Sequence, residues 1–423
     1  MIGLLVLVFL VGYLAIIFEH KISIDKSSSA LLVGTLCWTL VSLISTNMQE
    51  TTEKLMHQVG EIGGILFFLM GAMTIVELID TYRGFDLITS KITTRNQVKL
   101  LWIVCMITFF LSASLDNLTT AIVMVSLIKK LVNEQKTKLL FVGMIVLSAN
   151  AGGAWSPMGD VTTTMLWIGG NVSAGGIVLS LFLPSLVSLL LPLVILSFSL
   201  KGELSLVDIP IQVEESKREK NIIFWTGFIG LISVPIFKTV THLPPFIGML
   251  LALGVIWTVA ELLLKNKDEN YRSKFSVIKV LEKVDIPSIL FFLGILLAVS
   301  ALETVGVLSN AANWLTSTIK NETLTVTLMG LLSSVIDNVP LVAATMGMFS
   351  LEQYPMNHPF WELLAFCAGT GGSTLIIGSA AGVAAMGIQK IEFFWYVKKI
   401  SWLALIGYFA GIGVFLLQKI LFE

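Results

Sequence analysis

Ser112-Ala-Ser-Leu-Asp-Asn117 and Ser333-Ser-Val-Ile-Asp-Asn338 are two copies of one polar phrase, Ser-x-x-x-Asp-Asn, and each copy lies inside an apolar stretch. A carboxylate in a membrane interior is costly, and an acid placed there usually serves a function. Because Asp116 and Asp337 occupy matching positions in two stretches, we expect them to belong to one site.

The composition is that of a membrane protein. The chain has 423 residues, of which 55% are hydrophobic and 13% charged, and its mean hydropathy is +0.88. Many apolar runs are close to the roughly 20 residues that span a bilayer, which predicts an all-α polytopic membrane protein without a soluble domain. The apolar run 3–18 lacks a basic leader, so we interpret it as a retained span. Cys37, Cys105 and Cys367 all lie in apolar runs, which predicts neither disulfides nor a metal cluster.

Three stretches depart from a simple span, and a fourth matches one of them. Residues 99–132 and 321–350 are too long for one span and too short for two, and each holds an Asp-Asn phrase near its middle. They are predicted to be re-entrant hairpins of two half-length helices. Residues 138–168 contain two glycines, a proline and a further glycine, which predicts a helix broken in mid-membrane, and 360–388 is its counterpart.

Charge counting supports the hairpins. If both hairpins re-enter and the other ten runs cross, all but four of the 27 basic residues fall on one side of the membrane. The positive-inside rule makes that side cytoplasmic and places both termini outside. Treating the first hairpin as a span would move the basic loops 129–138, 201–220 and 265–283 outside, so we reject that topology. The four basic residues left on the external side are Lys54, Lys238, Lys320 and Lys419.

The two halves of the chain repeat each other. Ile65-Leu-Phe-Phe-Leu recurs as Ile289-Leu-Phe-Phe-Leu, and Gly152-Gly153 recurs as Gly371-Gly372. In the charge-based topology the copies have opposite orientations, and such inverted repeats are typical of secondary transporters, whose sites lie where broken helices meet. The expected organisation is a first repeat at 1–200, a cytoplasmic linker at 201–220 and a second repeat at 221–423.

The breaks carry the oxygen-bearing side chains that hard cations prefer. Because Ser379 stands where the first half has Asp160, the site should be asymmetric. Two simpler explanations stay open: the tip residues cap the second arms of the hairpins, and Pro157 causes a plain kink. The main candidates are Asp116, Asn117, Asn150, Asp160, Thr162, Thr163, Asp337 and Asn338, and the further candidates are Ser112, Ser114, Thr119, Ser156, Ser333, Ser334 and Ser373.

Two more acids occupy equivalent positions in the halves. Glu61 and Asp285 each stand four residues before an Ile-Leu-Phe-Phe sequence, near a predicted membrane entrance. They could form an ion or proton access path, or they could be acids favoured at helix N-termini by the helix dipole. His57 lies one turn before Glu61 and could tune a pH response, although a histidine in a loop is the simpler interpretation.

The assembled motifs resemble those of the NhaD family of sodium/proton antiporters, within the ion transporter superfamily that also includes divalent-anion/sodium symporters. The resemblance covers nearly the whole chain and is carried by 114–120, 148–163 and 336–340. It implies a secondary transporter that exchanges cytoplasmic Na⁺ or Li⁺ for external protons in a bacterial plasma membrane, and it marks the main candidates above as functional positions, with Glu61 and Asp285 less certain. The expected Na⁺ ligands are Asp116, Asn117, Asn150, Asp160, Asp337 and Asn338.

A physical mechanism follows if a proton and Na⁺ compete for the same carboxylate oxygens. We expect no cofactor, no enzymatic activity and no nucleic-acid partner, and a second copy of the chain is a plausible partner within the lipid. The main alternative is a sodium-coupled symporter of a dicarboxylate or other anion. Acids at both tips, and the lack of Lys or Arg in the predicted core, argue against that alternative. A channel would have little use for broken helices in both repeats.

Overall fold

The structure, a computed structural model, is entirely helical over the residues it describes, which are 1–17, 19–89, 94–200, 202, 217–335 and 338–422. Nine of the described helical stretches are long and apolar enough to cross a membrane. The predicted all-α polytopic membrane protein is therefore confirmed, whereas the count of ten spans and two re-entrant hairpins stays a prediction.

The first part of the chain forms ten helices in the described residues. They are α1 (Ile2–Ile17), α2 (Glu19–Ile22), α3 (Lys26–Ile44), α4 (Met48–Thr81), α5 (Asp86–Thr89), α6 (Gln97–Leu115), α7 (Asn117–Leu131), α8 (Gln135–Ala154), α9 (Val161–Ile168) and α10 (Ala174–Ser197).

The second part follows the same order of long helices and breaks. Its elements are α11 (Lys217–Thr241), α12 (Pro245–Leu264), α13 (Glu269–Phe275), α14 (Val277–Leu281), α15 (Ile286–Thr304), α16 (Val307–Thr318), α17 (Glu322–Leu332), α18 (Asn338–Met348), α19 (Pro359–Gly371), α20 (Ala380–Gln389), α21 (Phe393–Tyr396), a π-helical turn η1 (Val397–Ser401) and α22 (Trp402–Phe422).

The predicted breaks occur where the polar phrases lie. One helix ends at Leu115 and the next begins at Asn117, so Asp116 alone separates α6 from α7. The chain is likewise interrupted between α8 and α9 and between α19 and α20. The predicted tip at Asp337 lies outside the described residues, but α18 begins at Asn338. The short helices α5, α13 and α14 and the helix α16 were not predicted from the sequence.

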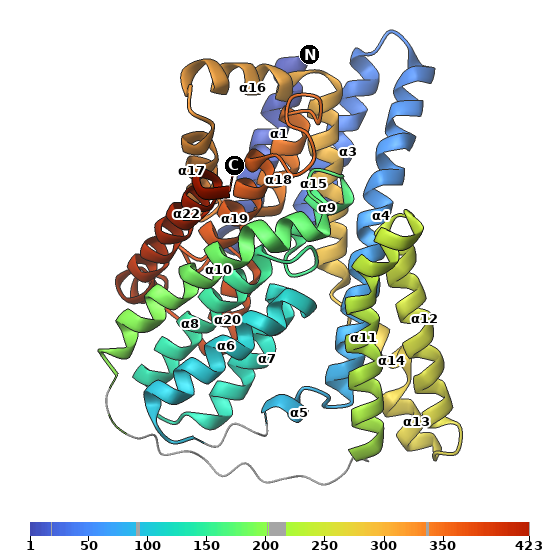
Figure 1. The fold of residues 1–423 in the computed structure, drawn as a ribbon. Coiled ribbons are helices and arrows are strands. Elements are labelled where there is room, and N and C mark those ends of the chain that lie inside the picture. The colour runs from blue at the N-terminus through green and yellow to red at the C-terminus, as the bar shows by residue number, and fades with distance from the viewer. Residues whose placement is uncertain (18, 90–93, 201, 203–216, 336–337, 423) are drawn as a thin grey trace.

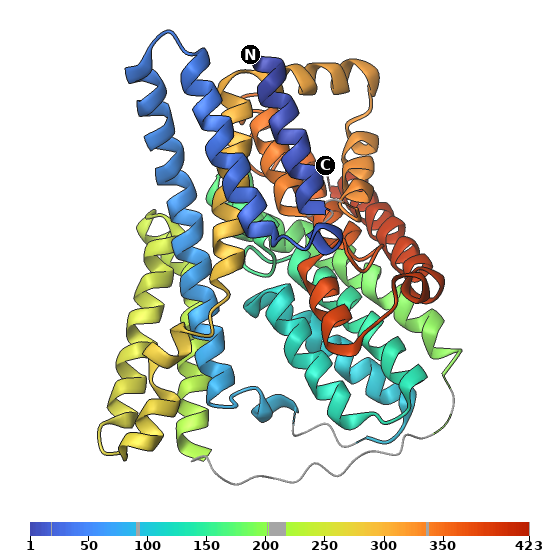
Figure 2. The same ribbon diagram turned by 180° about the vertical axis from the view of Figure 1, so that it is seen from behind.

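Figures 1 and 2 show how the long helices lie relative to the two sets of broken elements. In Figure 1, α6 and α7 lie in the lower half of the molecule and α17 and α18 in the upper half, with α9, α10 and α19 between them. Figures 1 and 2 place the pair α1 and α3 in the upper half and the pair α11 and α12 in the lower half, on either side of the long α4. The helix pairs α6–α7 and α17–α18 therefore lie toward opposite ends of the fold.

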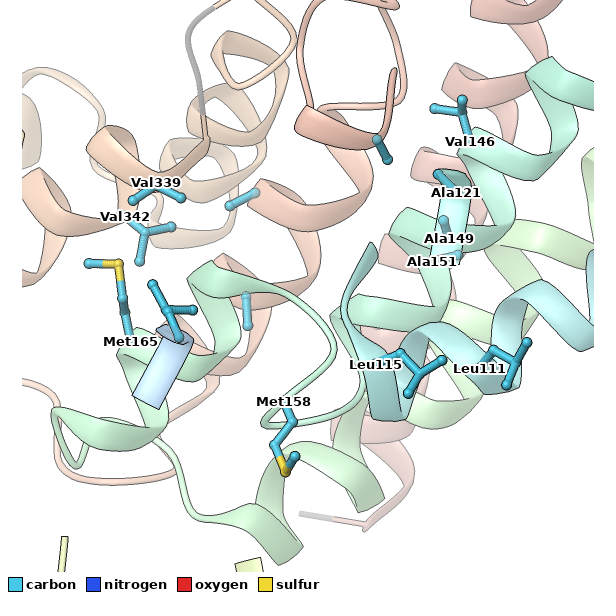
Figure 3. Packing of buried hydrophobic residues seen from close by; sticks show 14 of the residues in the cluster. Leu111, Leu115, Ala121, Val146, Ala149, Ala151, Met158, Met165, Val339 and Val342 are labelled. Atoms are coloured by element: carbon cyan, nitrogen blue, oxygen red, sulfur yellow. The ribbon is translucent and has the colours of Figure 1, made fainter. Parts of the chain in front are cut away.

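Equivalent close contacts hold the broken helices in the two halves. The hydroxyl of Ser112 donates to the carbonyl oxygen of Ala149 at 2.6 Å, and that of Ser333 donates to the carbonyl oxygen of Ala368 at 2.8 Å. Figure 3 shows Ala149 and Ala151 of α8 among small and branched side chains close to Ala121 of α7. The three cysteines are free and buried, as expected.

Glycines permit the closest of these approaches. A Cβ added at Gly152 would overlap the carbonyl oxygen of Phe109, and one added at Gly371 would overlap that of Gly330. We predict that Gly152→Ala destabilises the protein by about 1–3 kcal/mol, because the backbone of α6 must move away. The melting temperature of the detergent-solubilised protein checks this.

The matched control is Gly254→Ala in α12, where nothing lies within 4 Å of the added Cβ. This variant should melt at or slightly above the temperature of the unaltered protein, because alanine is a better helix former than glycine. Equal melting temperatures for the two variants would contradict the close approach of α6 and α8.

Candidate functional site

Asp116 forms the junction between α6 and α7 in an unusual backbone conformation. Its φ of 85° and ψ of 158° lie in a region that side-chain-bearing residues rarely adopt. One carboxylate oxygen accepts a hydrogen bond from the backbone N–H of Thr119 at 2.8 Å, and the other accepts from the Thr119 hydroxyl at 2.9 Å. Asp116 therefore caps α7, as the simpler explanation proposed, and it does so at the cost of backbone strain.

Asn117 turns inward from this junction. It is 5% exposed, and its side-chain N–H₂ group donates to Oδ1 of Asn150 at 3.1 Å and to Oδ2 of Asp160 at 2.7 Å. The first Asp-Asn phrase thus contacts both sides of the break between α8 and α9.

Asn150 links the two halves of the chain. Its side chain is fully buried, and its N–H₂ group donates to the hydroxyl of Ser373 at 2.8 Å and to that of Ser379 at 2.9 Å. Ser379 caps α20 through the backbone N–H of Gly382, just as Asp160 caps α9 through that of Thr162. The break in α8–α9 and its counterpart in α19–α20 therefore lie against each other.

Asp160 is the point on which these elements converge. It is 2% exposed, and its Oδ1 accepts hydrogen bonds from the backbone N–H and the hydroxyl of Thr162, both at 3.0 Å. The N–H₂ group of Asn338 lies 3.3 and 3.4 Å from its two oxygens. Amides from both Asp-Asn phrases thus donate to one buried carboxylate at a helix N-terminus, an arrangement that favours negative charge there.

The asparagine side chains around Asp160 can act as hydrogen-bond donors or as acceptors. Rotating an asparagine amide by 180° exchanges its N–H₂ group for its oxygen. Asn117 and Asn338 can therefore donate to Asp160 in one arrangement and offer oxygen ligands to a cation in another. The partners of Asp160 can therefore change between donor and acceptor by amide rotation alone.

A cavity of about 60 Å³ opens beside Asp160. One water needs roughly 10–15 Å³ of such volume, so the cavity accommodates a cation with a few waters. Apolar side chains close much of it, and Figure 3 shows Leu115 and Met158 at the break together with Val339 of α18. Its polar lining comprises Lys26, Ser114, Asp116, Asn117, Asp160 and Asn338, together with Thr164 and Ser288.

The presence of Lys26 in this lining corrects the expectation that no Lys or Arg lies in the core. Charge counting placed Lys26 in a surface loop, but the start of α3 lies beside the cavity, which Ala380 of α20 also lines. The ammonium of Lys26 lies 4.6 Å from the centre of the Phe291 ring. Thr164 also lines the cavity and was not predicted from the sequence, although it directly follows the predicted Thr163.

The remaining candidates divide into structural and peripheral residues. Ser112, Ser156 and Ser333 donate to backbone carbonyls of neighbouring segments, and Thr163 donates to the carbonyl of Asp160, so their hydroxyls stabilise the breaks. Ser334, which follows the end of α17, donates to the carbonyl of Leu331 in the last turn of that helix.

Glu61 and Asp285 are not part of the cavity lining. Asp285 is exposed and caps α15 through the N–H of Ser288, which fits the helix-terminus interpretation. Glu61 is exposed beside His57, at 3.8 Å, and α4 begins at Met48, so the helix-terminus interpretation is wrong for Glu61. Asp337 lies outside the described residues.

Comparisons with known proteins identify the family of this chain. A family model described as "Citrate transporter" matches residues 13–369. Sodium/proton antiporter 1 of Arabidopsis thaliana is 48% identical over 97% of this chain and 71% of its own length, and the Na⁺/H⁺ antiporter NhaD of Alkalimonas amylolytica is 32% identical over 97% of this chain and 89% of its own. The chain belongs to the NhaD family of sodium/proton antiporters.

A solved structure supports the fold of this NhaD-family chain. The YdaH transporter of Alcanivorax borkumensis, whose structure is described as having an unusual topology, matches with a TM-score of 0.60 over 96% of this chain and 98% of its own. The sequences are 11% identical, so the match concerns the fold alone.

The strain at Asp116 gives a test of the junction in this NhaD-family chain. We predict that Asp116→Gly is more stable than Asp116→Ala by about 1 kcal/mol, because both variants lose the carboxylate cap but only glycine adopts a positive φ without strain. Melting temperatures of the two purified variants check this. An alanine variant that melts at or above the glycine variant would show that the junction does not have this conformation.

Proposed function

We propose that this NhaD-family chain exchanges Na⁺ or Li⁺ for protons at the cluster around Asp160. It is an antiporter and not an enzyme, in agreement with its relatives. The observation that carries the site assignment is the buried Asp160 carboxylate with Asn117 and Asn338 directed at it from two separate helix starts. Hard oxygen ligands at a helix break within the membrane suit a small monovalent cation.

The exchange follows from competition for one set of oxygens. When Asp160 is charged, it attracts a cation, and rotation of Asn117 and Asn338 supplies further oxygens. When Asp160 is protonated, the cation loses its main ligand and leaves. An inward proton gradient then drives the cation outward, provided that the site faces one side of the membrane at a time. The proposed Na⁺ ligands are Asp116, Asn117, Asn150, Asp160, Asp337 and Asn338, with Thr162 and Thr163 fixing the start of α9.

An inverted repeat would provide this alternation. The repeats proposed at 1–200 and 221–423, joined by the linker 201–220, are supported by the equivalent Ser112 and Ser333 contacts and the equivalent caps of α9 and α20. The positions of α6–α7 and α17–α18 in opposite halves of Figure 1 support hairpins that enter from opposite faces. Within this scheme ten helices cross and two hairpins re-enter.

The protein is a multi-pass integral membrane protein. We propose that the basic loops are cytoplasmic and both termini external, because the uneven distribution of Lys and Arg supports that orientation. A bacterial plasma membrane stays a prediction, since the reported relatives come from both plants and bacteria. A homodimer is likewise only proposed.

One observation favours a second function. A family model described as "Citrate transporter" matches most of the chain. Sodium-driven uptake of a labelled dicarboxylate into proteoliposomes, without sodium-dependent proton movement, would favour such a symporter.

We predict that Asp160→Asn lowers sodium-dependent proton flux in proteoliposomes by roughly a hundredfold, because removing a buried charged partner costs about 3 kcal/mol or more. Asp116→Asn and Asp337→Asn should also reduce the flux strongly. Asp285→Asn is the matched control, since Asp285 is an exposed cap, and it should transport nearly normally. Normal exchange in Asp160→Asn would contradict the proposed site.

A further inference from the structure

A lysine of α11 holds the far end of the short helix that begins after Asp160. The Nζ of Lys238 donates a hydrogen bond of 2.7 Å to the backbone carbonyl oxygen of Trp167. The same ammonium lies 4.7 Å from the centre of the Trp167 indole ring. Trp167 belongs to the last turn of α9, where the helix dipole favours a positive charge. Lys238 therefore contacts both the backbone at the end of α9 and the aromatic side chain of Trp167.

The position of Lys238 makes this contact informative. It lies near the end of α11, a helix apolar enough to cross a membrane, and it is half-buried. A lysine near a helix end usually extends toward water. Lys238 instead turns to Trp167, although its neighbours Ile236 and Val240 are exposed. The contact replaces hydration with a specific link between two helices.

Helix α9 connects this link to the proposed cation site. Asp160 caps its N-terminus, and Trp167 packs edge-on against Phe68 of α4, with ring centres 6.2 Å apart, next to Lys238 of α11. The eight residues of α9 form a continuous helix of about 12 Å, so we treat it as one rigid element. A displacement of Asp160 must therefore also displace Trp167 relative to α4 and α11.

We propose that Lys238 is a positioning residue of the transport cycle: it anchors α9 to α11 in the state described here and releases Trp167 when α9 moves. This inference rests on the proposed function, because it assumes two states that differ in the position of α9. The contact stabilises only one of them. Its loss therefore shifts the equilibrium away from this state by about tenfold, as expected for a hydrogen bond from a charged donor together with a cation–π contact.

The shift can be measured from the two sides of the membrane. The apparent affinity for Na⁺ on each side equals the intrinsic affinity multiplied by the fraction of protein facing that side. The ratio of the two apparent affinities thus changes by the same factor as the equilibrium between the states. In proteoliposomes of known orientation, Lys238→Met should change this ratio by about tenfold, whereas a residue with a merely structural role would not alter it.

Two controls isolate the contact. Lys238→Arg keeps a charged donor and should leave the ratio within about twofold of the unaltered protein. Lys320→Met removes an exposed lysine of the same predicted face and should also leave it unchanged. If Lys238→Met is too unstable to purify, Lys238→Gln removes the charge while keeping a hydrogen-bond donor and should give a smaller change in the ratio, of about threefold.

Amide hydrogen exchange gives a readout that does not depend on transport. Loss of the anchor should speed exchange about tenfold at Gly169 and Gly170, after the end of α9, and leave the equivalent helix α20 unchanged. Sodium-driven flux in the unaltered protein with an unchanged affinity ratio and unchanged exchange in Lys238→Met would overturn the inference. Absence of sodium-dependent flux in the unaltered protein would instead refute the proposed function, while the exchange measurement still decides whether Lys238 anchors α9.

Discussion

The centre of this fold depends on the solvation of one buried carboxylate. Asp160 is withdrawn from water, and a charge in such a place is tolerated only when hydrogen-bond donors replace the water. Those donors come from the start of α9, from Asn117 at the start of α7 and from Asn338 at the start of α18. Satisfying Asp160 therefore fixes where Asn117 and Asn338 lie, and with them the starts of α7 and α18.

The chemical nature of the donors is as important as their number. A lysine or arginine bonded directly to Asp160 would hold the carboxylate in one state and compete with any cation. Asparagine amides stabilise the charge more weakly and can present oxygen as readily as nitrogen. A transport site must release what it binds, so neutral and reversible partners suit it. Lys26 lines the same cavity as these amides.

Much of this arrangement could be predicted from local sequence features. Long apolar runs predict the helices, and the Asp-Asn phrases and the glycines around Pro157 predict the breaks, because these signals depend on nearby residues only. The repeated motifs also predicted that Asn150, Asp160 and the second half would meet, and the bonds from Asn150 to Ser373 and Ser379 agree. The position of Lys26 beside the cavity and the contact between Lys238 and Trp167 could not be predicted, because they depend on how distant helices pack. Charge counting treats every lysine outside an apolar run as belonging to the membrane surface, and it therefore placed Lys26 away from the site.

The central claim is that Na⁺ and protons compete for the carboxylate of Asp160 and its neighbours. The most direct test is calorimetric titration of the purified protein with Na⁺ at a series of pH values. Competition predicts that, on the acidic side, the apparent dissociation constant for Na⁺ rises about tenfold for each unit fall in pH when one proton is displaced. A dissociation constant that stays the same across the pH range in which the protein is folded would contradict the account.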